Sequence, residues 1–238
     1  MERIGIFCSA ADNIEPVYFE KAQELGTWMG QTQKTLVYGG ANLGLMECVA
    51  KAAKENGGFV MGVVPTKLEE RGAVSDLLDV TFRVDNLSER KDAMLRESDI
   101  LVALPGGVGT LDEVFHVMAS ASIGYHAKKV ILYNVNGFWN GLLAFMDELK
   151  GKGFARRPME QFYGVANSFE ELIDLLDSNL DYFLELFHLE TGLTVVEAYQ
   201  AFDVILEMAL TFDELIKENP ELLQNLPLPR GLGIVVVE

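Results

Sequence analysis

Basic residues are scarce in this sequence of 238 residues. Lysine and arginine together number 19 against 36 aspartates and glutamates, which gives a formal net charge of −17. Duplex nucleic acid presents a dense array of phosphates and requires a basic protein face, so we expect no nucleic-acid partner. From residue 168 onward 15 acidic residues stand against 2 basic ones. We interpret this excess as a solvated helical face, and we expect any bound phosphate to occupy a small, locally positive pocket.

Long apolar runs and metal-ligand patterns are also missing, and we expect no secretory leader. No stretch approaches the roughly 18–20 apolar residues that cross a bilayer, so we expect no membrane partner. Only about seven residues precede the first small polar cluster, too few for a signal peptide. Cys8 and Cys48 lie in apolar surroundings, and the dispersed histidines lack ligand spacing. We therefore expect a cytoplasmic protein with reduced, buried cysteines, no metal and no cofactor.

Short apolar runs alternate with helical spacing through the first three-quarters of the chain. The runs predict strands at 3–8, 35–38, 59–64, 80–84, 100–104, 130–134 and 162–166. The helical spacing covers 15–29, 45–55, 87–97, 110–122, 139–150 and 168–176. This alternation predicts an α/β fold: a Rossmann-like, doubly wound, mostly parallel sheet with helices on both faces.

The rhythm changes beyond Asp177, and we divide the chain there. We expect residues 1–177 to form the Rossmann-like nucleotide-binding catalytic domain. Residues 178–238 are expected to form an acidic, mainly helical C-terminal extension, packed on that domain or on a partner subunit. The role of this extension is left open.

The segment PGGVGTLDE, residues 105–113, is the strongest candidate site because it joins a predicted strand to a predicted helix. Its three glycines let the backbone approach a ligand closely, and the helix N-terminus that follows favours an anion. The spacing fits neither the dinucleotide motif nor the Walker motif. A capping box with Thr110 as N-cap and Glu113 three residues on is the alternative interpretation; it leaves the glycines unexplained.

Two further loops follow predicted strands. YGGANLGLMECV, residues 38–49, carries Gly39, Gly40 and Gly44 and suggests a second close approach of the backbone to a ligand. In NLSERKDAM, residues 86–94, a Ser88 N-cap would place Arg90 and Lys91 in the first helical turn, against the helix dipole. A local rule broken without visible compensation suggests a functional role, although both cations pointing into solvent would also explain it.

These motifs resemble those of the LOG family, often labelled lysine decarboxylase-like, whose characterised members are cytokinin riboside 5′-monophosphate phosphoribohydrolases. PGGVGTLDE matches the family's PGGxGTxxE, ERKDAM matches its RK pair, and further matches are LVYGGANLGLM, GVVP and IGYHAKKVILYNVNGFWNGLL. The resemblance covers residues 3–177 and implies a Rossmann-like homodimer. It implies Arg90 and Glu113 as catalytic residues. The substrate- and phosphate-binding residues that it implies are Gly106, Gly107, Val108, Gly109, Thr110, Gly39, Gly40, Gly44, Lys91 and Met94.

The sequence departs from the family pattern at several positions. Ala10 stands in a segment where the family has a glycine-containing C-G-S-S, and Ala41, Glu47 and Lys129 replace a usual glycine, glycine and proline. The phosphate motif is intact, so the departures bear mainly on which base is released.

The function implied by this resemblance is hydrolysis of the N-glycosidic bond of a nucleoside 5′-monophosphate, a cytokinin riboside monophosphate or an AMP-like nucleotide. Glu113 would stabilise the oxocarbenium-like state and activate or orient water, and Arg90 would hold phosphate or steady the departing base. The alternative is a non-catalytic nucleotide or cofactor carrier of the same fold. A pyridoxal-dependent decarboxylase and a dinucleotide dehydrogenase are disfavoured, because no lysine has a distinctive setting and the first turn, CSAADN, has no glycine.

Overall fold

The computed structural model describes residues 2–155 and 157–178. They belong to a unit that spans Met1–Asn179, while Leu180–Glu238 form a second unit. The C-terminal extension expected at 178–238 therefore lies outside the described residues, apart from its first position. The boundary after Asp177 stays a prediction.

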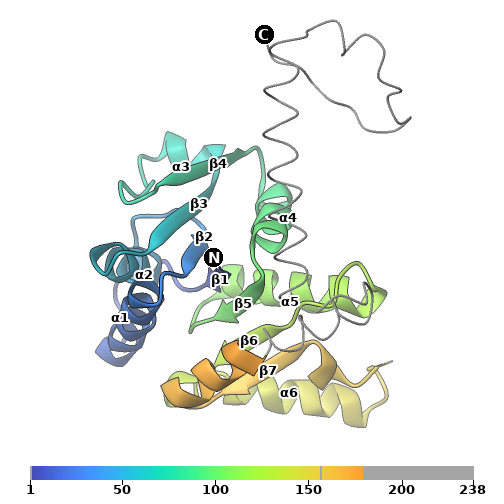
Figure 1. The fold of residues 1–238 in the computed structure, drawn as a ribbon. Helices are drawn as coiled ribbons and strands as arrows, with labels where there is room; N and C mark the ends of the chain where they lie inside the picture. Colours follow the sequence, from blue (N-terminus) through green and yellow to red (C-terminus); the bar gives the residue numbers. More distant parts are fainter. Residues whose placement is uncertain (1, 156, 179–238) are drawn as a thin grey trace, which may run out of the picture. The chain divides into compact units, whose positions relative to one another are not determined.

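Seven strands form one parallel sheet in the order β4-β3-β2-β1-β5-β6-β7 (Figure 1). The strands are β1 (Arg3–Phe7), β2 (Thr35–Tyr38), β3 (Phe59–Pro65), β4 (Val80–Val84), β5 (Ile100–Ala103), β6 (Val130–Tyr133) and β7 (Tyr163–Ala166). The central strands β1, β2, β5 and β6 are buried almost throughout, as apolar strands covered on both faces should be. The predicted doubly wound α/β fold is confirmed.

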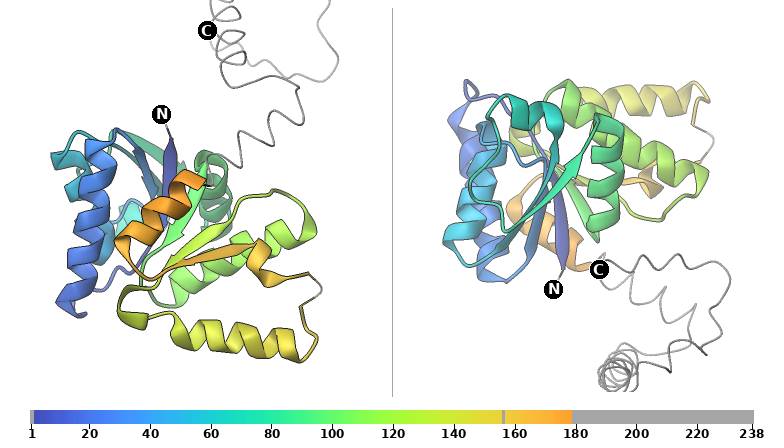
Figure 2. Two further views of the ribbon diagram at one scale, coloured as in Figure 1. Left: turned by 60° about the horizontal axis from the view of Figure 1, so that its bottom comes forward. Right: turned by 90° about the horizontal axis from the view of Figure 1, so that it is seen from above.

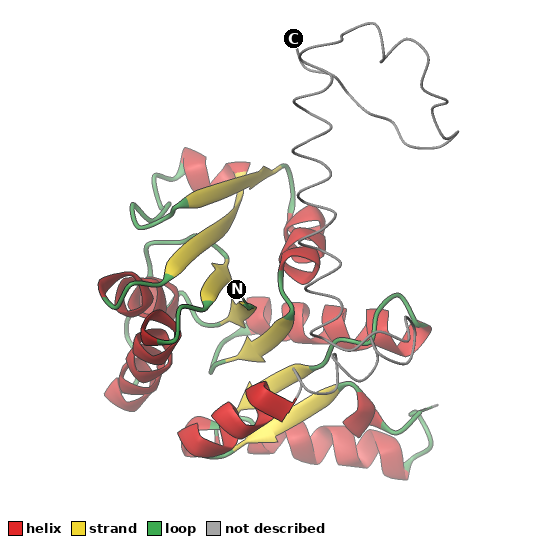
Figure 3. Cartoon of the chain, viewed as in Figure 1, coloured by secondary structure: helices red, strands yellow, loops and turns green. Residues whose placement is uncertain are grey.

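Helices cover both faces of this sheet (Figures 2 and 3). They are α1 (Pro16–Gln31), α2 (Gly44–Glu55), α3 (Thr66–Glu70), α4 (Leu87–Glu97), α5 (Val108–Ile123) and α6 (Asn140–Gly151), with 3-10 turns η1 (Val135–Gly137) and η2 (Met159–Gln161). Residues 169–178 are also helical. No helix in the described part of the chain is long and apolar enough to cross a membrane.

The strands alternate their side chains between two apolar cores. Ile4 and Ile6 of β1 face α1 and α2, whereas Phe7 faces the core that contains residues of α4 and α5. Both cores are nearly free of solvent, so burial of apolar surface, at about 25 cal/mol per Å², is the main favourable contribution to this packing. The two cores hold the sheet between its helical layers and fix where its carboxyl edge lies.

The winding reverses direction at β1, which lies between β2 and β5. The chain moves outward from β1 to β4 and then returns across the sheet through α4 to reach β5. Ligands of such folds bind where the order reverses, beyond the carboxyl ends of the strands. Here Ser9, just after β1, donates its amide to Pro105 O at 3.2 Å and accepts from Leu45 N at 2.9 Å. The loops after β1, β2 and β5 are thereby joined at this edge.

Candidate active site

The N-terminus of α5 lies at this reversal point and leaves backbone donors free. Gly107 is the N-cap, in an extended conformation, and it provides no side-chain cap. The Leu111 amide bonds back to Gly107 O at 3.0 Å, whereas the amides of Val108, Gly109 and Thr110 have no acceptor within the described residues. Such free amides and the positive end of the helix dipole form an anion site.

The capping box at Thr110 and Glu113, the alternative interpretation of this segment, is not formed. The helix begins two residues earlier than predicted, so Thr110 is already inside the first turn and buried. Its side chain packs on Gly106, where an added Cβ would lie 2.0 Å from Thr110 Oγ1. At Gly107 and Gly109 an added Cβ would meet no atom within 4 Å. Gly106 therefore serves internal packing, and the other two glycines face open space.

Arg90 of α4 and Glu113 of α5 are brought together at the same edge. Arg90 Nη1 lies 3.6 Å from Glu113 Oε1, and the two side chains are only 14% and 7% exposed. Arg90 Nε is buried and has no hydrogen-bond partner among the described residues. A buried ion pair with an unsatisfied donor is costly for folding alone. Such a pair at the reversal point is typical of a site that interacts with a ligand.

Burial raises the pKa of Glu113 from 4.5 to about 7. Loss of water around the carboxylate is the largest cause; Arg90 and Lys91 lower the pKa and Asp112 raises it. A carboxyl group that titrates near neutral pH is suited to exchange a proton during catalysis. The burial of Glu113 thus places it in the range where a general acid or base works best.

The bounds of α4 agree with the sequence prediction, but its N-cap does not. Asn86, not Ser88, is the N-cap, and its side chain accepts from the amides of Ser88 and Glu89 at 2.9 and 3.0 Å. Arg90 therefore lies one turn inside the helix, where its amide bonds to Asn86 O. Because the dipole effect fades within the first turn, the expected conflict with the dipole is smaller than the sequence suggested. The Arg90 guanidinium lies beside the backbone at Gly39 and forms an ion pair with Glu113.

The second glycine loop packs on protein atoms and not on open space. A Cβ on Gly39 would lie 1.7 Å from Arg90 Nη2, so the bare backbone there makes room for the guanidinium. Gly44 has a φ of +54°, and a Cβ would meet Ala10 C at 2.5 Å. Gly40 is similarly close to a side chain of β3. These glycines shape the site by letting the loops approach one another closely.

The N-terminus of α2 is occupied by the protein itself. The Gly44 amide donates to Asp12 Oδ1 at 3.0 Å, and the Leu45 amide donates to Ser9 O. An aspartate at this position accepts a hydrogen bond from a free amide and places a negative charge at the positive end of the helix dipole. Sequence analysis missed Asp12, because 32 residues separate it from the amide that it caps. Of the two helices that follow glycine loops, α5 is therefore the better candidate for a phosphate.

The remaining predicted site residues fall into different environments. Val108 is 83% exposed beside the free amides of α5. Lys91 Nζ lies 2.8 Å from the Asp112 carboxylate, one residue before Glu113. Met94 is fully buried in the core that contains residues of α4 and α5, where it supports α4. No cluster of three potential metal ligands occurs within residues 2–155 and 157–178.

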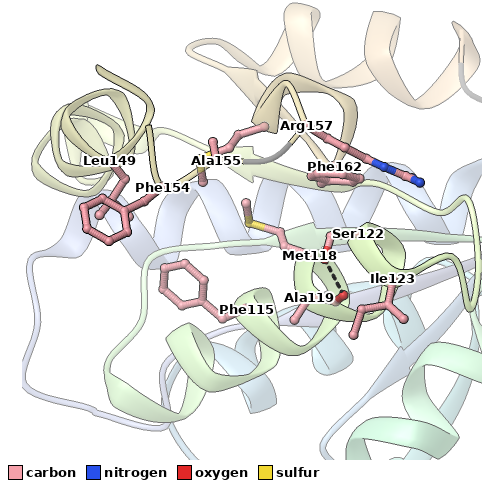
Figure 4. A pocket seen from close by; sticks show the side chains of 11 residues that line it. Phe115, Met118, Ala119, Ser122, Ile123, Leu149, Phe154, Ala155, Arg157 and Phe162 are labelled. Atoms are coloured by element: carbon pink, nitrogen blue, oxygen red, sulfur yellow. Dashed lines mark hydrogen bonds between the residues drawn. The ribbon is translucent and has the colours of Figure 1, made fainter. Parts of the chain in front are cut away.

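An apolar groove lies on a different face of α5 (Figure 4). It has a volume of about 710 Å³ and is bordered by α5, α6 and the segment around Phe154. Phe115 and Met118 line it, and Arg157 supplies its charged side chain. Phe115 is two residues from Glu113, about 200° around the helix. The groove therefore lies away from the polar site and has none of its anion-binding features.

Fold and site together define a doubly wound α/β protein with a glycine loop and a buried arginine–glutamate pair at its switch point. A family model described as "Possible lysine decarboxylase" matches residues 46–176. The chain belongs to this family, the LOG family. A probable cytokinin riboside 5′-monophosphate phosphoribohydrolase of Oryza sativa subsp. japonica, LOGL9, is 43% identical over 64% of this chain and 67% of its own length. The Arabidopsis thaliana enzyme LOG5, of the same name, is 35% identical over 74% of this chain and 78% of its own length.

Solved structures of the same fold include proteins that carry the molybdenum cofactor. The Moco carrier protein of Chlamydomonas reinhardtii is 25% identical and has a TM-score of 0.59, covering 76% of this chain and 98% of that one. The molybdenum cofactor binding protein of Rippkaea orientalis is also 25% identical, with a TM-score of 0.58 over 75% of this chain and 97% of that one. Both the enzyme and the carrier alternatives therefore have relatives of this fold.

Proposed function

We propose that this protein hydrolyses the N-glycosidic bond of a nucleoside 5′-monophosphate, releasing the free base and ribose 5-phosphate. The observation that carries the proposal is the buried Arg90–Glu113 pair beside the free amides of α5. One side of the site offers donors for a phosphate, and the other offers a carboxylate for the sugar. The names of the relatives at 35–43% identity support the same reaction.

In the proposed reaction the phosphate is held by the amides of Val108, Gly109 and Thr110. Binding this group, remote from the bond that breaks, positions the ribose. The ionised Glu113 stabilises positive charge on the ribose as the bond to the base lengthens, and it takes a proton from the attacking water. The water oxygen bonds to the anomeric carbon, the base leaves with the bonding electrons, and the proton passes to the base. Arg90 steadies the departing base or the phosphate.

The carrier alternative is favoured by the similarity to Moco carrier proteins. A carrier, however, has no need of a buried carboxylate whose pKa lies near 7 next to an arginine. A literal lysine decarboxylase would require pyridoxal phosphate on a free lysine amine. The lysine beside the site, Lys91, is paired with Asp112. These residues do not fit that cofactor, so the enzyme acting on nucleotides is the better-supported proposal.

We infer that the active unit is a homodimer in the cytoplasm, with residues 1–177 as its catalytic domain. The two free cysteines, Cys8 buried and Cys48 half-buried, are compatible with a reducing compartment.

Replacing Glu113 by glutamine tests the chemical role directly. The variant keeps the size of the side chain and removes the ionisable carboxyl, so turnover should fall by about 10²-fold or more. Nucleotide affinity, measured by calorimetry with AMP, should change little because the phosphate donors are untouched. The expected result is binding without turnover. Normal turnover by Glu113→Gln would overturn the assignment of Glu113.

A further inference from the structure

Helix α4 carries Arg90, yet it has a small apolar anchor. Ala93 and Met94 are buried in it and Leu95 is partly buried, whereas α5 buries four apolar residues. Its C-terminal end is held by Lys128, whose Nζ donates to Leu95 O and Ser98 O at 2.7 and 2.6 Å. With so little apolar contact, the position of the part of α4 that faces α5 depends strongly on polar contacts.

Three consecutive residues of α4 contact α5 through polar pairs. Arg90 faces Glu113, and Lys91 Nζ lies 2.8 Å from Asp112. Asp92 Oδ1 lies 3.1 Å from His116 Nε2. The two atoms of this last contact are close, but their geometry is not that of a hydrogen bond, and His116 Nε2 has no hydrogen-bond partner among the described residues. Exposure rises along the series, from the buried Arg90 pair to Asp92, whose side chain is 65% exposed.

The Lys91–Asp112 and Asp92–His116 contacts reach α5 at positions four residues apart, or about 6 Å along the helix axis. Two contacts spaced along α5 limit both sliding and rotation of α4, whereas one contact would leave rotation free. Arg90 depends on this restraint, since its Nε is unpartnered and its ion pair with Glu113 is 3.6 Å long. His116 is one turn beyond Glu113 on the same helix.

We propose that the contact between Asp92 and His116 positions the catalytic pair, holding Arg90 in register with Glu113. Both residues act through Arg90 and touch no substrate. The kinetic part of this inference rests on the proposed hydrolase function. Partly exposed pairs contribute little to folding stability, but misplacing a catalytic group by about 1 Å can cost up to about 10²-fold in rate. Loss of the pair should therefore reduce turnover far more than it reduces stability.

The test compares Asp92→Asn, His116→Gln and the double variant in base release from AMP. Each single variant should lower kcat by about 3–10-fold and change KM by less than about twofold. The double variant should be no slower than the slower single variant, because the two residues act as a unit. Asp92→Glu, which keeps the carboxylate, should retain most activity. The matched control is Arg83→Gln, which removes an exposed ion pair with Glu69 elsewhere in the molecule and should leave kcat unchanged.

A second readout does not require activity. In the ligand-free protein the Arg90 Nε–H signal, assigned by its loss in Arg90→Lys, reports by NMR on how the guanidinium is held. It should shift or broaden in Asp92→Asn and His116→Gln and stay unchanged in Arg83→Gln. An unchanged Arg90 signal overturns the positioning role, and so do wild-type kcat values or additive losses in the double variant. A wild-type protein that releases no base overturns the proposed function alone, and the NMR result then decides on the pair.

Discussion

Replacing Glu113 by glutamine should change folding stability in a way that depends on pH. In the folded protein burial raises the pKa of Glu113 to about 7, against 4.5 for the ordinary group. The folded state therefore binds the proton more tightly than the unfolded chain. The tighter binding of this proton stabilises the folded protein. This stabilisation is fully present below pH 4.5 and is lost as the pH rises through 7. The interval corresponds to about 3 kcal/mol, and the glutamine variant, which has no proton to lose, is spared this loss.

Urea denaturation of both proteins at pH 5.5 and pH 8.5 measures the effect. The lower value stays above the sequence pI of about 4.5, where precipitation would interfere. Of the 3 kcal/mol, about 2 kcal/mol is lost between these two pH values. The free energy of unfolding of Glu113→Gln, relative to wild type, should therefore rise by about 2 kcal/mol from pH 5.5 to pH 8.5. The variant also loses the ion pair with Arg90, which stabilises the ionised Glu113 at high pH. The value of about 7 already includes this attraction, so no separate correction is needed.

A control variant separates this effect from general pH dependence. Glu55→Gln removes a carboxyl at the exposed end of α2, which remains in water in both states. Its stability relative to wild type should change much less between the two pH values. A pH-independent difference for Glu113→Gln, or one that changes in the opposite direction, would refute the burial of an ionisable Glu113.

Three further predictions concern the site. Because Asp112 raises the pKa of Glu113, Asp112→Asn should move the acidic limb of the kcat–pH profile to lower pH; an unmoved or raised limb contradicts this. Gly39→Ala places a Cβ 1.7 Å from Arg90 Nη2, so base release should fall by about tenfold or more in a protein whose circular dichroism is unchanged. Gly107→Ala meets no protein atom within 4 Å, so thermal stability should be unaffected while KM for the monophosphate rises by about tenfold; a stability loss without a KM change would place the phosphate elsewhere.

Much of the fold could be predicted because its elements carry strong local signals. The bounds of β2, β4 and α4 agree with those predicted from apolar runs and helical spacing. The C-cap at Gly124, whose φ is 98°, follows from glycine chemistry at a helix end. Helix α3 was missed because it has five residues, none of them buried, and therefore no apolar periodicity. The N-cap of α4 and the start of α5 were misplaced because Asn86 and Gly107 cap these helices, where Ser88 and Thr110 offered stronger side-chain signals.

The candidate site could be predicted where one motif contains it, but not where the fold brings distant residues together. The glycine loop and Glu113 lie in a single segment, and the likeness to a family motif pointed to Arg90. That Gly39 makes room for Arg90, 51 positions along the chain, follows only from the packing of α4 across the sheet. The cap by Asp12 and the contact of Asp92 with His116 have the same origin. Local spacing has no information on which distant side chains a crossover brings together.

The central claim is best tested by incubating the purified protein with nucleoside 5′-monophosphates and with the matching nucleosides. AMP and an isopentenyl-AMP form the first set, and free base and ribose 5-phosphate are followed by chromatography. The proposed function predicts release of base from monophosphates and none from nucleosides, because the amides at the start of α5 position the substrate through its phosphate. Absence of release from every monophosphate, with AMP still raising thermal stability, would contradict a hydrolase and favour a carrier.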